Sequence, residues 1–306
     1  MKKGKPKKEK REKDTGLMIV CIVLFLLGLG ILLYPAASNQ WNKWRQEQLV
    51  SDYTSSLTEL ETQGEDFSAE WARAYAYNET LHTATLSDSF TITGAQEEPD
   101  EEYMACLNLA GDGIMGYVSI PSLDLKLPIY HTTSDEVLQE GVGHLEGSSL
   151  PVGGESTHAV LAGHRGLPNQ ELFANLDLLE EGDVFLIYVL DSTLCYEVDQ
   201  ILVVEPTDTE ALSVVEGQDL VTLLSCTPYG VNTERLLVQG HRVEYEEETV
   251  EEETQTVSVV TTHTHYLLWA LGGLTVTALL TALLYLFLKK SGGRDKKHER
   301  KESGEE

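Results

Sequence analysis

The chain has 306 residues and a formal net charge of −28, and its length allows one or two domains. The charge is unevenly placed. Residues 1–16 hold eight Lys and Arg and residues 289–306 hold seven, whereas residues 35–265 hold only seven against 42 Asp and Glu, a net of −35. Each basic end adjoins a long apolar run, so the basic residues do not indicate nucleic-acid binding, and no nucleic-acid partner is expected.

Two apolar stretches contain no charged residue: 17–34, of 18 residues, and 266–288, of 23 residues. Each is long enough to span a bilayer as a helix. The positive-inside rule places both basic tails in the cytoplasm, which predicts a two-pass protein of the cell membrane with residues 35–265 outside the cell. The alternative for the first stretch is a cleaved signal peptide ending near Ala36-Ala37-Ser38, but the run is longer than a usual signal-peptide core.

The segment that follows the first apolar stretch, 38–84, has helical periodicity with a break at Gly64. Two apolar faces recur at helical spacing, formed by Tyr53, Leu57 and Leu60 and by Phe67, Trp71 and Tyr75. The pattern predicts a helical stalk and packing element. Residues 86–103 are polar and acidic without periodicity, which predicts a loop.

Residues 114–245 contain many short apolar runs separated by Pro, Gly and Asp, and this pattern predicts a closed barrel or a sandwich of β-strands. The runs are Met115–Ile120, Leu125–Tyr130, His158–Ala162, Val184–Val189, Leu194–Val198, Ile201–Val204, Leu220–Ser225 and Arg235–Val243. A short helical turn is expected over Leu172–Leu179. The acidic, Thr-rich residues 246–265 form a tether of low hydrophobicity to the second apolar stretch.

Three cysteines, Cys106, Cys195 and Cys226, lie in the region predicted to be outside the cell. An odd number leaves at least one thiol outside any disulfide. Cys106 and Cys195 stand in apolar company as small buried side chains, and a disulfide between them remains an alternative. No His and Cys pattern has zinc spacing, so neither a metal nor a cofactor is expected.

Cys226 is the candidate nucleophile. It follows the apolar run Val221–Ser225, a turn rich in Pro and Gly comes next, and Arg235 begins the following run. A hairpin of this length brings a thiol and a guanidinium to the same rim. A strong nucleophile beside a fixed cation is what attack on a carbonyl group requires.

His164 is the candidate proton carrier. It also follows an apolar run, and Gly163 and Gly166 flank it where a turn is expected. An imidazole can protonate a leaving amine and later deprotonate an incoming one, so Cys226, His164 and Arg235 together suit acyl transfer between amides. The other histidines of this region are interpreted as core or rim residues (His131, His144 and His158) or as facing solvent or an acidic neighbour (His241).

The sequence around these residues resembles one family. Thr222-Leu223-Leu224-Ser225-Cys226 is similar to the Thr-Leu-x-Thr-Cys signature of the sortases, the membrane-anchored cysteine transpeptidases of Gram-positive bacteria, and Arg235 falls where their arginine falls. The resemblance extends through residues 116–130, 141–150 and 153–166 and is greatest to class C, the pilin-polymerising sortases. Ser225 departs from the usual threonine, but both are small hydroxyl residues.

The resemblance implies a fold and a function. The expected fold is mainly β, a closed sortase-type barrel of about eight strands, with an N-terminal helical region and a lid loop, flanked by two transmembrane helices. The implied reaction cleaves an LPXTG-like sorting signal after its threonine. Cys226 would form the thioacyl-enzyme, His164 would act as general acid and then general base, and Arg235 would hold the substrate carbonyl or oxyanion. The implied acceptor is a lysine of another pilin subunit.

Class C sortases carry a lid with an Asp-Pro-aromatic motif. The matching residues here are Asp88-Ser89-Phe90, without the proline. The resemblance implies that Asp88 pairs with Arg235 and that Phe90 covers the thiol. The alternative is an acidic loop with one incidental Phe.

Two other functions stay open. One is a housekeeping sortase that anchors surface proteins to the cell-wall precursor, and the other is a catalytically idle barrel that binds sorting signals as a pilus scaffold. The predicted organisation is a cytoplasmic tail, a transmembrane helix, an extracytoplasmic helical region, a lid-like loop, a catalytic barrel, a tether, a second transmembrane helix and a second tail, over residues 1–16, 17–34, 35–85, 86–113, 114–245, 246–265, 266–288 and 289–306.

Overall fold

The computed structural model describes residues 7–81, 99–167 and 170–245, together with Gly272, Gly273, Thr275 and Thr277. Of residues 7–21 and Leu24 it describes the backbone alone. The chain divides into two compact units, residues 1–37 with 260–306, and residues 38–259. The second unit carries the β-structure and every candidate site residue.

A single helix, α1 (Lys7–Thr62), begins the described chain and contains Pro35. It includes the predicted span 17–34 and the first part of the predicted stalk. Among the residues whose side chains are described, no helix is long and apolar enough to cross a membrane. The span 17–34 lies partly outside those residues and the span 266–288 almost wholly outside them.

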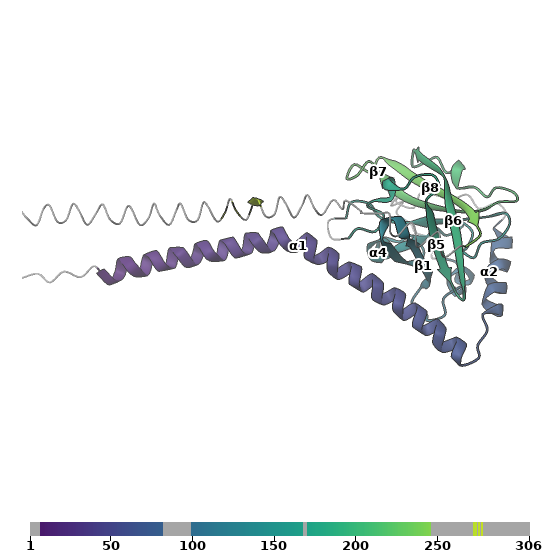
Figure 1. Ribbon diagram of the computed structural model, residues 1–306, viewed down its shortest axis with the longest axis horizontal. Coiled ribbons are helices and arrows are strands. Elements are labelled where there is room, and N and C mark those ends of the chain that lie inside the picture. Colours follow the sequence, from purple (N-terminus) through teal and green to yellow (C-terminus); the bar gives the residue numbers. More distant parts are fainter. Residues whose placement is uncertain are drawn as a thin grey trace, which may run out of the picture. The chain divides into compact units, whose positions relative to one another are not determined.

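Eight strands close into a barrel in the described part of the chain (Figure 1). Their order around the barrel is β1-β2-β3-β4-β7-β8-β6-β5. Most neighbours are antiparallel, but β2 pairs with β3 and β4 pairs with β7 in parallel. The strands are β1 (Ile114–Ile120), β2 (Leu125–His131), β3 (Val142–His144), β4 (Thr157–Ala162), β5 (Val184–Val189), β6 (Ser192–Val204), β7 (Asp219–Thr227) and β8 (Glu234–Val243). The predicted closed barrel of about eight strands is confirmed.

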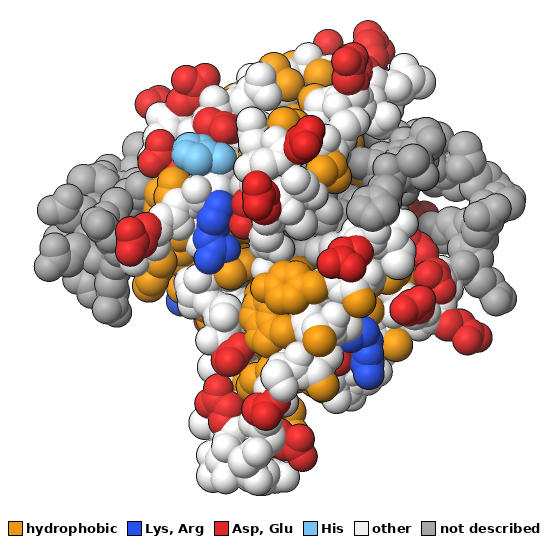
Figure 2. Space-filling view, turned by 90° about the vertical axis from the view of Figure 1, so that its right-hand side faces the viewer, with side chains coloured by type: hydrophobic (Ala, Val, Ile, Leu, Met, Phe, Trp, Pro, Cys, Tyr) orange, Lys and Arg blue, Asp and Glu red, His pale blue; other side chains and the backbone are white. Residues whose placement is uncertain are grey.

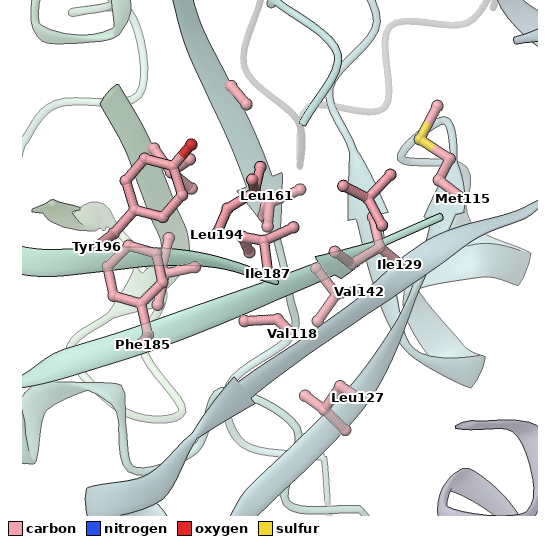
Figure 3. Close-up of a cluster of buried hydrophobic side chains, with 14 of the residues drawn as sticks. Met115, Val118, Leu127, Ile129, Val142, Leu161, Phe185, Ile187, Leu194 and Tyr196 are labelled. Carbon is pink, nitrogen blue, oxygen red and sulfur yellow. The ribbon is translucent and has the colours of Figure 1, made fainter. Parts of the chain in front are cut away.

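The interior of the barrel is filled by apolar side chains from alternate positions of the strands (Figure 3). Phe185 and Tyr196 stack there with their ring centroids 5.6 Å apart. The residues labelled in Figure 3 are Met115, Val118, Leu127, Ile129, Val142, Leu161, Phe185, Ile187, Leu194 and Tyr196. Burial of this apolar surface is the main stabilising term of the unit, at about 25 cal/mol for each Å² removed from water.

A second apolar cluster covers the outer face of β4, β7 and β8. The strand positions that point away from the interior supply Val160, Ala162, Leu224 and Leu237, and covering segments supply Leu138, Leu145 and Leu212. Leu138 belongs to helix α4 (Asp135–Glu140) and Leu212 to the 3-10 helix η3 (Glu210–Leu212). These three strands are therefore apolar on both faces, which explains why β7 reads as a continuous apolar run rather than an alternating one.

The helical region before the barrel packs on it at defined points. Helix α2 (Ser68–Thr80) follows the break at Gly64, as predicted. The Trp71 indole nitrogen donates to a carboxylate oxygen of Asp191 at 2.8 Å. From α1, the Tyr53 hydroxyl donates to the Met115 carbonyl, and burial raises the pKa of Tyr53 to about 12. These contacts attach α1 to the start of β1 and α2 to the turn between β5 and β6.

The structure corrects several boundaries. The predicted loop 86–103 ends in helix α3 (Glu101–Ala105), whose N-terminus is capped by Asp100. The two strands predicted over 194–204 form the single strand β6, whose pairing with β8 is irregular between Val198 and Gln200. Strand β3 and helix α4 were not predicted, because each has six residues or fewer and too little periodicity. The expected turn over Leu172–Leu179 contains the 3-10 helix η2 (Leu176–Leu178).

The surface agrees with the acidic composition of residues 35–265. Figure 2 shows acidic side chains spread over one face of the molecule, with few basic side chains among them. An apolar patch lies near the centre of the same face.

Candidate active site

The parallel pairing of β4 with β7 brings His164 and Cys226 to one edge of the barrel. In this ladder Ala162 is the partner of Leu224. The Gly163 amide continues it by donating to the Leu224 carbonyl at 3.0 Å. Two residues beyond the last pair, the register sets His164 opposite Cys226. Parallel strands end at the same edge, so this arrangement follows from the topology rather than from sequence proximity.

The antiparallel pairing of β7 with β8 sets Arg235 directly opposite Cys226. Residues that face each other in this way have Cβ atoms about 5 Å apart, so both side chains leave the sheet on the same face. Both are buried, with exposed fractions of 5% for Cys226 and 7% for Arg235. By strand alternation they lie on the outer face of the barrel, at the end of the apolar cluster that contains Leu224 and Leu237.

Backbone contacts fix the orientation of the Arg235 side chain. One guanidinium nitrogen donates to the carbonyl oxygens of Asn232 at 3.3 Å and Glu234 at 3.1 Å. Both acceptors lie in the hairpin between β7 and β8. The predicted strand, turn and strand, with Cys226 at the end of one strand and Arg235 at the start of the next, is confirmed.

The loop that carries His164 has little freedom. The His164 carbonyl accepts a hydrogen bond from the Phe173 amide at 3.2 Å. The Phe173 ring lies so close to Gly163 that a Cβ there would approach it to 2.7 Å, so only glycine fits. Gly166 has a φ of +94°, in the left-handed region that favours glycine. Glycine is therefore needed at 163 because space is lacking and at 166 because of the backbone conformation.

Hydrogen bonds hold the His164 loop to β7 on each side of the candidate pair. The Ser225 hydroxyl donates to the Gly163 carbonyl at 2.8 Å, and the Arg165 guanidinium donates to the Thr227 hydroxyl at 3.1 Å. Ser225 is completely buried. Its hydroxyl therefore has a structural role, which a threonine would also fill.

Burial and a neighbouring charge act on His164 in opposite directions. Partial burial lowers the pKa of His164, and the negative charge of Asp135 raises it to a smaller extent. Asp135 is the first residue of α4, the helix that covers the outer face of this part of the barrel. The net direction is downward, so the imidazole is mainly neutral at pH 7 and can accept a proton.

Three of the other histidines are core residues, as predicted. The ring nitrogens of His144 face the Tyr103 hydroxyl at 3.0 Å and the Ser149 carbonyl at 2.8 Å, and burial lowers the pKa of His144 to about 4. His131 and His158 are also buried, with both ring nitrogens at hydrogen-bond distance from oxygen atoms. The fourth, His241, lies 3.3 Å from a carboxylate oxygen of Asp199, the acidic neighbour that the sequence suggested.

The remaining cysteines have buried positions. Cys106, Cys195 and Cys226 are not disulfide-bonded, so the alternative of a Cys106–Cys195 bridge is not realised in the structure. Burial raises the pKa of Cys106 to about 11, which keeps it a neutral thiol. Cys195 packs with Val184 and Leu186 in a small apolar cluster.

The predicted site and the described site differ at three residues. Asp88 and Phe90, the predicted lid residues, lie outside the described residues. The sequence indicates no role for Arg165, because nothing in it shows where an arginine side chain will be buried. Within the described ranges, no group of three His, Cys, Asp or Glu side chains is placed to hold a metal ion.

Comparison with known proteins places these residues within a known domain family. A family model of the sortase domain matches residues 118–243, which include His164, Cys226 and Arg235. Sortase A of Bacillus anthracis is 30% identical over 149 residues, covering 48% of this chain and 68% of that protein. Sortase C-1 of Actinomyces oris has a similar structure, with a TM-score of 0.55, 47% identity and coverage of 59% of this chain and 100% of that one. Sortase C of Streptococcus pneumoniae has a TM-score of 0.58, 41% identity and coverage of 65% and 97%.

Proposed function

The chain belongs to the sortase family of cysteine transpeptidases, and from this premise we propose that it polymerises pilins. It cleaves an LPXTG-like sorting signal after the threonine and joins that threonine to a lysine amine of another pilin subunit. The observation that carries the proposal is the pairing of Cys226 with Arg235 across β7 and β8, at the edge where the parallel strand β4 leads to His164.

The first half of the reaction forms a thioester. The neutral imidazole of His164 takes the proton of the Cys226 thiol, and the sulfur attacks the threonine carbonyl carbon. The C–S bond forms as the carbonyl oxygen becomes an oxyanion, beside the guanidinium of Arg235. His164 then returns the proton to the nitrogen of the following residue, the C–N bond breaks and the amine leaves.

The second half reverses these roles. A neutral lysine amine attacks the thioester carbon and gives its proton to His164, which now acts as general base. The C–S bond breaks, an isopeptide bond forms, and the thiol recovers its proton from the imidazole. Arg235 is always charged and is fixed by the hairpin carbonyls, so it stabilises both tetrahedral intermediates without reorganisation.

Several features support a lysine amine of another subunit as the acceptor. The S. pneumoniae sortase C, 41% identical to this chain, has pilin substrates. Residues 35–265 contain only two lysines, Lys43 and Lys126, so the enzyme offers few amines of its own. Lys43 is also engaged, since its ammonium lies 2.7 Å from a carboxylate oxygen of Asp124. The acidic surface in Figure 2 would attract a basic acceptor segment.

The lid and the membrane anchors are also proposals, and both rest on the sequence. We assign Asp88 and Phe90 to a lid over Cys226, because Asp88-Ser89-Phe90 resembles the class C motif. We assign residues 17–34 and 266–288 to anchors that leave the barrel outside the cell with both termini in the cytoplasm. The charge pattern supports this topology, and the backbone of residues 17–34 is helical.

The test uses the full-length protein and a Leu-Pro-x-Thr-Gly peptide, with intact mass as the readout. We expect a peptide adduct on Cys226 and none in Cys226→Ala. Addition of a pilin domain that carries an acceptor lysine should resolve the adduct into an isopeptide-linked product. Cys106→Ala is the matched control, since it removes a different buried thiol and should retain the adduct.

Other outcomes point to the alternatives. An adduct that is resolved by small amines but by none of a panel of pilin domains would favour anchoring to the cell-wall precursor. The absence of an adduct in the wild-type protein, and also in a variant with both Asp88 and Phe90 replaced by Ala, would favour the idle scaffold and overturn the transpeptidase proposal.

A further inference from the structure

Arg165 is a second buried arginine at the same edge, and the reaction described above does not use it. Its side chain is only 8% exposed. A guanidinium remains charged in proteins, and removing it from water is costly unless several of its N–H groups are bonded. The contacts of Arg165 therefore show what the fold gains from it.

Those contacts come from two segments that are distant in the sequence. The Nε atom donates to the Ala174 carbonyl at 3.1 Å, and Nη2 lies 2.6 Å from a carboxylate oxygen of Asp177. The Nη1 atom donates to the Thr227 hydroxyl at 3.1 Å. The guanidinium also lies over the Tyr229 ring, 5.8 Å from its centroid. One side chain thus joins the segment around η2 to the end of β7 and the hairpin.

One of these contacts, between Arg165 and Thr227, lies next to the candidate catalytic pair. Arg165 follows His164 directly, and Thr227 follows Cys226 directly. The β4–β7 register, continued past its last pair, sets Arg165 opposite Thr227. The contact between them therefore lies one residue beyond the candidate catalytic pair.

The Ser225 hydroxyl donates to the Gly163 carbonyl one residue before the pair, and Arg165 donates to the Thr227 hydroxyl one residue after it. These two hydrogen bonds, here called the bracket, hold the two segments together on both sides of His164 and Cys226. We propose that Arg165 is a positioning residue that sets the separation of the His164 imidazole and the Cys226 thiol, and this proposal rests on the proposed function. Displacement of reacting groups by about 1 Å can reduce a rate about 100-fold.

The fork geometry of arginine is essential to this role. Three separate N–H groups reach Ala174, Asp177 and Thr227 at once. A lysine ammonium is a point charge on a flexible stem and cannot reproduce that fork. Asp177 is 45% exposed, so solvent can take the place of the guanidinium there more easily than at Thr227.

The experiment compares full-length wild-type protein with Arg165→Gln, Arg165→Lys, Thr227→Val and Asp177→Asn. The readouts are kcat and KM with a Leu-Pro-x-Thr-Gly peptide, the melting temperature, and the rate of Cys226 alkylation by iodoacetamide against pH. Alkylation of Cys226→Ala is subtracted to remove the contribution of other thiols. Arg73→Gln is the matched control, since Arg73 also bonds a carboxylate (Glu70) and a carbonyl (Ala105) but is half exposed.

We expect Arg165→Gln to lower kcat about 100-fold with KM changed less than about twofold. The pH dependence of Cys226 alkylation should also shift from that of the wild type, because the thiol is no longer held at the same distance from the His164 imidazole. Arg165→Lys should restore only part of kcat. Thr227→Val should lower kcat about tenfold, at the low end of what the loss of one hydrogen bond to a charged group implies, and Arg73→Gln should match the wild type.

Three results would overturn the proposal: wild-type kcat in folded Arg165→Gln, a lower kcat with an unchanged alkylation profile, or full activity in Arg165→Lys. If Arg165→Gln does not fold, Thr227→Val and Asp177→Asn each remove a single contact, and wild-type profiles in both would overturn it as well. Failure of the proposed function is recognised separately, because the wild-type protein would then form no Cys226 adduct.

Discussion

The edge that carries His164 and the interior that carries His144 use the same side chain in opposite ways. His144 is completely buried on β3, and its ring nitrogens face a tyrosine hydroxyl and a carbonyl oxygen. His164 is partly exposed, just past the end of β4, in a loop fixed from both sides. Burial inside the barrel keeps the His144 imidazole neutral, whereas the partly exposed loop beyond β4 leaves the His164 imidazole accessible to solvent.

The cysteines repeat the contrast. Cys106 lies in apolar surroundings after α3, and burial together with the nearby Glu70 carboxylate raises its pKa. Cys226 is buried to a similar degree, but a guanidinium stands opposite to it in the sheet. Burial alone therefore does not distinguish the two thiols, and the proposed role of Cys226 depends on the guanidinium that faces it across the sheet.

The largest expected effect separates the two histidines. His164→Gln should lower the rate of thioester formation by about 10²- to 10⁴-fold, because it removes the proposed general acid and base, and should leave the melting temperature nearly unchanged. His144→Gln should retain kcat per folded molecule and lower the melting temperature. Single-turnover kinetics by intact mass and thermal unfolding measure both. Equal losses of kcat in the two variants would contradict the division into catalytic and structural histidines.

Much of this arrangement could be predicted from the sequence, because the elements around Cys226 are close to one another in the chain. The strand before Cys226, the turn after it and the strand that begins near Arg235 lie in one stretch of about 20 residues, so their proximity follows from hairpin geometry. His164 is about 60 residues away in the sequence, and its proximity to Cys226 depends on a parallel pairing that no local pattern encodes. For that pair, the family resemblance supplied what periodicity did not.

Other features were beyond sequence reasoning. Arg165 stands next to His164 in the chain, but its partners Ala174, Asp177 and Thr227 are known only from the fold. Asp135 influences His164 through α4, a helix too short to be predicted from periodicity. Both residues act through packing of segments across the barrel edge, which composition and spacing do not reveal.

Burial of His144 should also make the stability of the folded protein depend on pH. Burial holds the pKa of His144 at about 4 in the folded protein, against about 6.5 when unfolded. The folded state therefore binds fewer protons. The contribution of the neutral His144 to the free energy of unfolding, about 3 kcal/mol, is complete above pH 6.5 and is lost as the pH falls toward 4. His158 acts in the same direction, since burial also lowers its pKa.

The measurement is the free energy of unfolding in urea between pH 7.5 and 4.5, for the wild type and His144→Gln. The variant should be less stable at pH 7.5, and the difference between the two proteins should shrink as the pH falls. Other groups titrate equally in both proteins and cancel in the difference. A constant difference over the whole range would show that His144 does not carry this pH dependence.

The smallest expected effect tests the other half of the bracket around Cys226 and His164. Ser225→Thr keeps the hydroxyl that bonds the Gly163 carbonyl, and the additional methyl group in a buried position should cost about 1 kcal/mol, the low end for a group added to a packed site. Ser225→Ala removes the bond and leaves a buried carbonyl without its donor, which should cost about 1–3 kcal/mol.

Urea unfolding and kcat for thioester formation measure both variants. If the bracket positions the pair, kcat should fall severalfold in Ser225→Ala and stay within about twofold of wild type in Ser225→Thr, since only the former frees the His164 loop. Equal kcat values in the two variants would assign the hydroxyl to stability alone and leave Arg165 as the side that sets the geometry.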